Sequence, residues 1–193
     1  MLYDTKLVAA KLRRWENFMR EFRLPAWEEL PDLELYMDQV VALVCRYVDL
    51  HDAAPEPVLT SSSVNNYVRL KVMPAPVRKR YGRLHLAHLI VICCLKRSMS
   101  LASIQRVFPV DLTLEEARQI YGDFVRQYQA ASLLFVEQVR QAAGPVLDPK
   151  GAQEYPVNNL VITAAVAGAL YQLLADKILS LQSPVDENAG KGI

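Results

Sequence analysis

The chain has 193 residues, 52% of them hydrophobic, and a formal net charge of +1. This length and apolar content are enough for one or two small domains with a packed core, and they exclude an intrinsically disordered chain. Three cysteines without regular spacing argue against a disulfide framework, and the charged first residues lack the apolar run of a signal peptide. We therefore expect a cytoplasmic protein with reduced thiols.

The near-neutral total conceals two regions of opposite charge. Between Glu56 and Asp111 the sequence contains nine basic residues and no acidic residue. The rest of the chain contains 13 basic and 21 acidic residues, which gives it a charge of −8. Because basic surfaces attract phosphate, the segment is a candidate nucleic-acid interface. The structural alternative is a solvated basic surface that binds nothing specific.

The first predicted element is an amphipathic helix over residues 5–22. Its apolar stripe consists of Val8, Leu12, Trp15, Met19 and Phe22. Such a helix packs either on a partner subunit or on its own domain. In the linker that follows, we expect Trp27 to dock against the core. Asp32 is the predicted N-cap of a second helix over residues 33–50, and residues 51–57, with two prolines, are predicted to form a loop.

The basic segment is predicted to contain a short helix, a turn, a basic cluster and a buried helix. Thr60 or Ser61 is the expected N-cap of the short helix. Its inward-facing positions are Val64, Val68 and Val72. Pro74 and Pro76 end this helix, because proline cannot continue it. A nearly all-apolar helix follows over residues 83–97, and Ser100 is predicted to cap another short helix.

The run TSSSVNNYVRLKVMPAPVRKRYGRLHLAHL, followed by SMSLASIQRV, resembles the winged helix-turn-helix head of MerR-type transcription regulators. LPAWEELPDLELYMDQVV, together with SSVNNYV and PAPVRKRY, is similar to the bacterial domain-of-unknown-function family numbered 1836, which is predicted to bind DNA. The resemblance covers about residues 24–110 and implies a fold but no established activity. Where MerR-type heads have glycine before the turn and an acidic residue in the recognition helix, this chain has Lys71 and Val68.

The residues expected to bind DNA fall into three groups. Asn65, Asn66 and Arg69 are expected to face the groove, because their paired donors and acceptors can read base edges. Contacts to the DNA backbone are assigned to Ser62, Ser63 and Lys71. Contacts from the wing side to phosphates are assigned to Arg78, Lys79, Arg80 and Arg83. Tyr67 and Tyr81 have two interpretations, a hydroxyl contact to phosphate or packing within the head.

Two long helices are expected after the head. Thr113 to Glu116 form a predicted capping box that opens a helix of about 30 residues, ending at the stop signal Gly144-Pro145. Its coiled-coil-like seam consists of Ala117, Tyr121, Phe124, Tyr128, Ala131, Phe135, Val139 and Ala142. This seam packs either between subunits or against the next helix. That helix, over residues 157–181, has no charge for 19 residues, and we interpret it as a buried or intersubunit helix, with a membrane span as the alternative.

The sequence supports no catalytic chemistry. It has no glycine-rich phosphate loop, no nucleophile elbow and no HExxH or CxxC motif. His85 and His88 precede Cys93 and Cys94 on one predicted helix, but the two cysteines point about 100° apart. We therefore expect buried thiols and packing histidines, with no metal and no cofactor. The triple serine 61–63 is explained by helix capping.

The sequence thus predicts an all-α protein with a MerR-like winged helix-turn-helix head, a small β wing and two long C-terminal helices. The expected organisation is an N-terminal helix and linker over 1–31, a head over 32–110, a helical region over 111–182 and a disordered tail over 183–193. We expect a non-enzymatic transcriptional regulator that binds double-stranded DNA and forms a homodimer through the helix over 114–143, away from any membrane. The alternative is a protein-interaction scaffold with a degenerate head. The sequence identifies neither the operator nor an effector.

Overall fold

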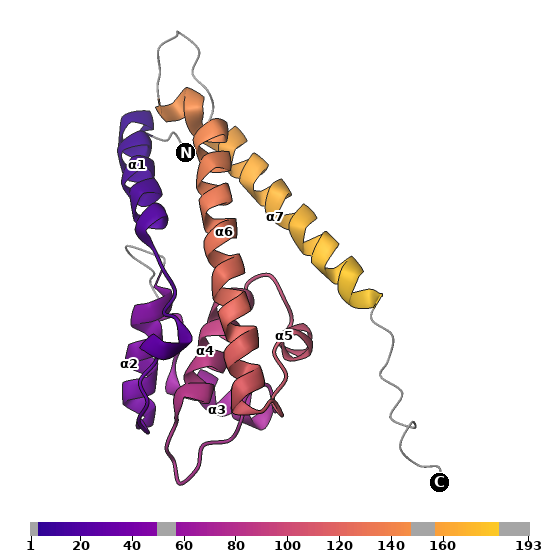
Figure 1. The fold of residues 1–193 in the computed structure, drawn as a ribbon. Helices are drawn as coiled ribbons and strands as arrows, with labels where there is room; N and C mark the ends of the chain where they lie inside the picture. The colour runs from indigo at the N-terminus through magenta and orange to yellow at the C-terminus, as the bar shows by residue number, and fades with distance from the viewer. Residues whose placement is uncertain (1–3, 50–56, 148–156, 182–193) are drawn as a thin grey trace. The chain divides into compact units, whose positions relative to one another are not determined.

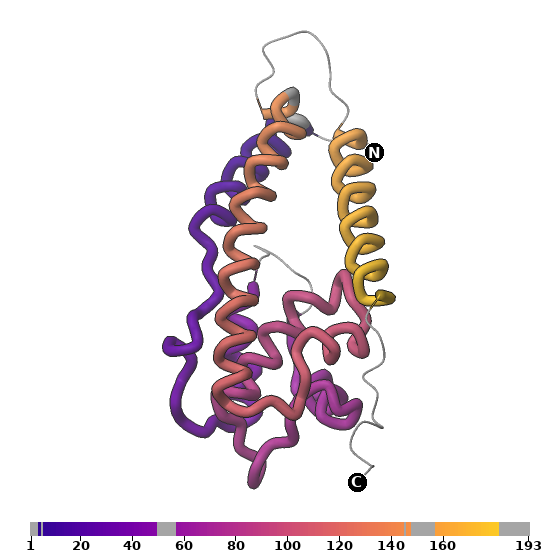
Figure 2. Tube along the Cα trace, turned by 45° about the vertical axis from the view of Figure 1, so that its right-hand side comes forward, coloured from indigo at the N-terminus to yellow at the C-terminus, as the bar shows by residue number. Residues whose placement is uncertain are grey.

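The computed structural model describes residues 4–49, 57–147 and 157–181 (Figures 1 and 2). All regular elements in these ranges are helical, which confirms the all-α class. They are α1 (Thr5–Glu21), the 3-10 turn η1 (Trp27–Glu29), α2 (Met37–Val48), α3 (Ser61–Arg69), α4 (Arg83–Leu95), α5 (Leu101–Val107), α6 (Leu114–Leu147) and α7 (Val157–Ser180). The chain divides into two compact units after Tyr155, and α7 is the described part of the second.

Helix α4 lies at the centre of the first unit and contacts α2, α5 and α6. Every residue from His85 to Cys93 is buried, as the nearly all-apolar sequence predicts. Trp27 is 5% exposed and packs edge-on against Tyr121 of α6, with ring centroids 6.0 Å apart. The linker tryptophan therefore docks against the core as expected.

Helix starts follow the predicted caps. The Thr60 hydroxyl accepts the Ser63 amide at 3.1 Å, and the Ser100 hydroxyl accepts the Ser103 amide at 3.1 Å. At α6 the Glu116 carboxylate accepts the Thr113 amide at 2.8 Å, while the Thr113 hydroxyl accepts the Glu116 amide at 3.3 Å. This reciprocal pair is the predicted capping box.

The predicted start of α2 at Asp32 is wrong. The helix begins at Met37, and the Gln39 side chain accepts the Tyr36 amide at 2.9 Å. The preceding residues are held extended, because the Leu35 backbone exchanges two hydrogen bonds of 2.9 and 3.0 Å with Tyr81. A long-range pairing has thus overridden a local capping signal.

The predicted β wing is not found as strands in the described ranges. Only two isolated antiparallel bridges occur near it, Leu35 with Tyr81 and Val77 with Arg80. The segment between α3 and α4 nevertheless projects beyond both helices in Figures 1 and 2.

The seam of α6 packs within the chain. Ala117 and Tyr121 are fully buried, and α6 contacts η1 and α4 there, while α1 runs beside its later half (Figure 1). The ring of Phe22, the residue after α1, lies 6.2 Å from the ring of Tyr128, and the ring of Trp15 lies edge-on to that of Phe135 at 5.8 Å, both measured between centroids. The N-terminal helix therefore packs on its own chain.

The predicted seam matches the buried stripe only in the first half of α6. Beyond Tyr128 the predicted Ala131 and Phe135 are exposed, and the buried residues are Ser132, Val136, Ala143, Val146 and Leu147. A straight helix has 3.6 residues per turn, so its contact stripe drifts away from a heptad repeat.

Gly144-Pro145 does not end α6, which continues to Leu147. A proline in the last helical turn removes one hydrogen bond close to carbonyls that lack helical partners in any case. Ala143 and Val146 are buried, and the Arg13 side chain of α1 donates a hydrogen bond to the Leu147 carbonyl. Packing and this contact together extend the helix past the predicted stop.

Helix α7 begins at the predicted Val157 and ends at Ser180, one residue before the predicted end. None of its most apolar 18-residue window is buried, and by length and composition α7 could cross a membrane. A core helix of a soluble protein passes the same test. Two other predictions, most of the loop 51–57 and the tail 183–193, lie outside the described residues.

Candidate nucleic-acid interface

Helix α3 turns a polar face to solvent. Ser62, Asn65 and Arg69 are exposed, whereas Val64 is fully buried and Val72 is 4% exposed. An Arg69 nitrogen donates to the Asn66 side-chain oxygen at 2.7 Å, so these two side chains are held as one unit. A shallow hollow lies over this face, lined by Ser62, Ser63, Asn65, Asn66 and Arg69. The structure therefore brings together the residues predicted to face the groove.

Lys71 ends α3 in a left-handed conformation, with φ 56°. Its amide bonds to the Val68 carbonyl at 3.0 Å, and the Val72 amide bonds to the Tyr67 carbonyl at 3.0 Å. This pair of hydrogen bonds forms a Schellman motif, in which the left-handed position is usually occupied by glycine. The side chain of Lys71 is exposed. The lysine thus stands at a position where the backbone itself favours glycine.

The basic cluster forms a two-residue turn. Val77 and Arg80 exchange backbone hydrogen bonds of 3.2 and 2.9 Å, and the central residues Arg78 and Lys79 have φ angles of 50° and 63°. Two positive φ angles define a type I′ turn, for which Asn-Gly is preferred. Both central side chains are exposed. The turn therefore presents two cations at its tip.

Backbone strain in the described ranges coincides with positive charge. The three non-glycine residues with positive φ there are Lys71, Arg78 and Lys79, all within the acid-free segment. A left-handed conformation costs an L-residue about 1–2 kcal/mol. Residues held in costly conformations cluster at functional sites, so the strain marks these three cations as candidate ligand-binding groups.

Two residues that the sequence did not assign to the site hold this turn. The guanidinium of Arg80 lies 3.5 Å from the centre of the Tyr36 ring and donates to its hydroxyl at 2.5 Å. His85 accepts the Gly82 amide on Nδ1 at 3.0 Å, and its Nε2 lies 3.2 Å from the Ala75 carbonyl. Because Nδ1 accepts a hydrogen bond, Nε2 carries the ring proton and donates to the Ala75 carbonyl, and burial lowers the pKa of His85. The sequence did contain a signal for this role of His85: it lies three residues after Gly82 at the start of a helix, where a side chain can accept the N-cap amide.

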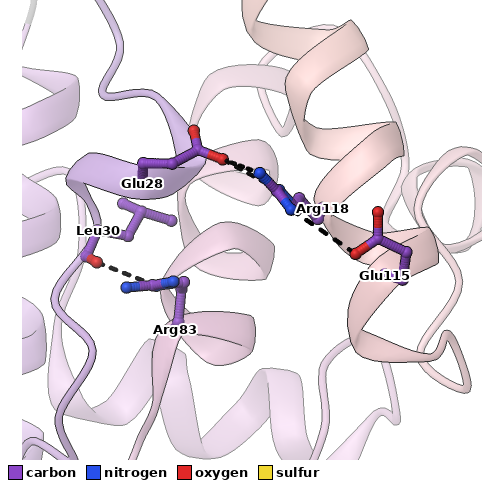
Figure 3. A network of polar contacts seen from close by, with 5 residues as sticks. All are labelled: Glu28, Leu30, Arg83, Glu115 and Arg118. Carbon is purple, nitrogen blue, oxygen red and sulfur yellow. Dashed lines mark hydrogen bonds and ion pairs between the residues drawn. The ribbon is translucent and has the colours of Figure 1, made fainter.

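Arg83 is turned toward the linker (Figure 3). Its Nε donates to the Leu30 carbonyl at 3.0 Å, and its guanidinium lies 3.8 Å from Asp32 and 5.9 Å from the Trp27 ring. The side chain is 22% exposed. Arg83 is therefore engaged within the chain, unlike the exposed Arg78 and Lys79.

Figure 3 also shows a second charged cluster, on the surface between η1 and α6. Two Arg118 nitrogens donate to one Glu28 oxygen at 3.0 and 2.7 Å, and Glu115 lies 3.8 Å away. A backbone hydrogen bond and then Arg118 lower the pKa of Glu28. These contacts pair both signs of charge, so the cluster offers no net basic surface.

Tyr67 and Tyr81 are core residues. They are 6% and 3% exposed, and burial raises the pKa of each phenol. Tyr81 also packs edge-on against His85 at 5.4 Å. Their burial favours packing within the head over contact with phosphate.

The histidines and cysteines of α4 are buried groups. Burial lowers the pKa of His88 to about 4 and raises the pKa of Cys93 and Cys94 to about 11 and 12. The His88 Nε2 has no hydrogen-bond partner, and the ring packs edge-on against Phe108 at 4.5 Å. Within the described part of the chain, no three His, Cys, Asp or Glu residues gather in an arrangement that could hold a metal.

Comparison with protein families gives one result. Residues 25–131 match the model of the domain of unknown function DUF1836. The matched range contains η1, α2 to α5 and the first half of α6. No curated protein and no solved structure matches the chain.

Proposed function

The chain belongs to the DUF1836 family, and from its site we propose a bacterial, cytoplasmic transcriptional regulator that binds double-stranded DNA. In this proposal the head is MerR-like: α3 enters the major groove and the turn Val77–Arg80 acts as a short basic wing on the phosphates. No enzymatic activity, metal or cofactor is part of the proposal.

One observation carries the proposal, the coincidence of exposed cations with backbone strain. Lys71, Arg78 and Lys79 occupy positions where glycine or asparagine would relax the fold. Because the surrounding 54 residues contain no acidic side chain, these cations have no carboxylate near in sequence to neutralise them. A basic, acid-free surface beside polar side chains on a helix is the footprint of a DNA-binding head.

Lys71, which stands where MerR-type heads have glycine, is consistent with this proposal. MerR-type heads have glycine before the turn, and Lys71 adopts the left-handed conformation that glycine adopts most readily. The chain geometry that glycine would permit is therefore kept, and a phosphate-binding side chain is added.

The first prediction concerns the turn. Replacing Arg78→Asn together with Lys79→Gly introduces the pair preferred in a type I′ turn while removing both charges. We expect unchanged or higher thermal stability, weaker binding to every duplex, and a slope of log affinity against log salt that is shallower by about two units. Fluorescence anisotropy across a salt series measures the slope, and thermal unfolding measures stability.

The control removes two charges elsewhere. Lys6→Ala with Lys11→Ala changes exposed residues of α1 and should leave the salt slope unchanged. Equal effects of both double variants would show that net charge alone, and not the turn, governs binding. Wild-type protein without salt-dependent affinity for any duplex would refute the proposed function.

The second prediction concerns reading of sequence. Asn65 is exposed on α3 and has no role in the cap or in the Asn66–Arg69 pair. Asn65→Ala should cost about 1–3 kcal/mol of binding free energy on a selected site and almost nothing on a scrambled duplex. Gln127→Ala, exposed on α6, is the matched amide control. Loss of affinity on both duplexes alike would show that Asn65 does not read bases.

The scaffold alternative rests on Arg80 and Arg83. Both guanidinium groups are engaged within the chain, Arg80 by Tyr36 and Arg83 by Leu30 and Asp32. Arginines that are engaged within the chain are less available to grip phosphates, which favours a head that has lost DNA binding. The salt series above separates the two functions, because only the regulator binds duplexes.

A further inference from the structure

The outward face of α3 carries a stripe of polar side chains. Ser62, Asn65, Asn66 and Arg69 occupy positions i, i+3, i+4 and i+7, which share one side of a helix. Side chains on a helix lean toward its N-terminus, so Arg69 reaches back over Asn66 and donates from Nη2 to the Asn66 Oδ1 at 2.7 Å. Both side chains line the hollow over this face. The Arg69 guanidinium therefore has a fixed neighbour on this surface.

This hydrogen bond determines which way the Asn66 amide faces. A guanidinium carries N–H donors and no acceptor, so only the amide oxygen can face it. The Asn66 Nδ2, which is a donor, consequently points away from Arg69, and the guanidinium keeps further N–H donors for another partner. The pair thus presents donors to a ligand, while its amide oxygen is turned toward Arg69.

The bases differ in the donors and acceptors that they present in the major groove. Guanine presents two acceptors, N7 and O6, whereas adenine presents the acceptor N7 and the donor N6. Thymine offers a single acceptor and cytosine a donor, so neither can accept from two donors. A bidentate contact from asparagine to adenine needs the amide oxygen to accept from N6, and in this chain Oδ1 accepts from Arg69. A pair that offers donors is therefore complementary to guanine.

Asn66 also reduces the freedom that Arg69 has to lose on binding. Ordering a long side chain in an interface costs conformational entropy. A guanidinium that is already held loses less of this freedom, and its planar fork keeps the direction needed for two parallel hydrogen bonds. Resting on the proposed function, we propose that Arg69 donates to N7 and O6 of a guanine and that Asn66 is the residue that positions it. Asn66 then does not read a base itself.

Asn65 provides a comparison within the same helix. It is the neighbouring asparagine, it is exposed, and it lines the same hollow, but it is not part of the Asn66–Arg69 pair. Replacing either asparagine with alanine removes the same atoms from this face. Only Asn66→Ala releases the guanidinium.

The test starts from a duplex that the wild-type full chain selects from random sequences. Each base pair of this duplex is replaced in turn, and fluorescence anisotropy gives the affinity for each duplex. At one base pair the wild type should prefer guanine over adenine by about 10- to 100-fold. Arg69→Ala should abolish the preference at that base pair, which identifies the base that Arg69 reads.

Three further variants separate positioning from reading. Asn66→Ala should lower the guanine-to-adenine ratio at that base pair by about three- to tenfold, with an unchanged slope of log affinity against log salt, because no charge is lost. Asn65→Ala should leave this ratio unchanged. Asn66→Asp keeps an oxygen for Arg69 and should retain the ratio, although its negative charge lowers affinity for every duplex. Circular dichroism confirms that the variants remain helical.

The outcomes distinguish this inference from the proposed function. A preference for any base other than guanine at the pair that depends on Arg69 would overturn the inference, as would equal effects of Asn65→Ala and Asn66→Ala on the ratio. Wild-type protein that binds every duplex alike would also overturn it, while the salt-dependent DNA binding of the proposed function would stand. Binding to no duplex would refute the proposed function and the inference with it.

Discussion

Tyr121→Ala is expected to lower the free energy of unfolding by about 3–5 kcal/mol, the usual cost of removing a buried aromatic side chain. Tyr121 is fully buried, packs on Trp27 and donates from its hydroxyl to the Pro25 carbonyl at 2.9 Å. It therefore connects the linker to α6. Urea denaturation followed by circular dichroism at pH 7.5 measures the change.

The matched variant is Tyr121→Phe, which keeps the ring and removes only the hydroxyl. It leaves the Pro25 carbonyl without this donor and should cost about 1 kcal/mol. If both variants cost the same, the hydroxyl contact dominates and the ring packing contributes little. A cost below 1 kcal/mol for Tyr121→Ala would contradict the docking of the linker on α6.

The second large effect is acid sensitivity through His88. Burial lowers the pKa of His88 from 6.5 to about 4, so the unfolded chain binds a proton more readily than the folded one. The stability contributed by the neutral, buried ring is complete above about pH 6.5 and is lost as pH falls toward 4. At 1.36 kcal/mol per unit, the loss from His88 between pH 7.5 and 5 is about 2 kcal/mol.

His88→Leu isolates this contribution. Leucine keeps an apolar contact with Phe108 and removes the titrating group, and His85 is present in both proteins. The quantity to compare is the difference in unfolding free energy between pH 7.5 and 5, which should be smaller in the variant by about 2 kcal/mol. The same pH dependence in both proteins would show that His88 is solvated or already charged when folded.

Most helix starts were predictable because their signals are local. Thr60, Ser100 and Thr113 each cap a helix through a hydroxyl that reaches an amide three residues ahead, and this depends only on nearby sequence. The bounds of α7 followed from an uninterrupted apolar run for the same reason. The central position of α4 followed from its apolar residues on every side.

The two wrong helix boundaries, the start of α2 and the end of α6, have long-range causes. Asp32 is a residue type that often caps a helix, but Leu35 pairs with Tyr81, a residue 46 positions away. This pairing holds the chain extended and delays the helix start. Pro145 is a residue type that usually ends a helix, but its buried neighbours and the contact from Arg13 extend α6 beyond it. Neither partner can be identified from the residues around the signal.

The candidate site was predicted in part. The outward face of α3 followed from helical spacing, because Val64 and Val72 fix which side is buried. Charge alone could not separate Arg78 and Lys79, which are exposed, from Arg83, whose side chain reaches back to Leu30 and Asp32. The positive φ angles of the cations were also beyond sequence reasoning, since these residue types rarely adopt them.

The pairing of α1 with the later half of α6 determines when the N-terminus can fold. Met19 and Ala9 of α1 are buried against residues that the ribosome adds more than a hundred positions later. At about 5–20 residues per second, α1 waits about 6–25 s after its synthesis for its covering helix. During that interval its apolar stripe has no partner on the nascent chain, so α1 is the segment where we expect chaperones to bind first during translation.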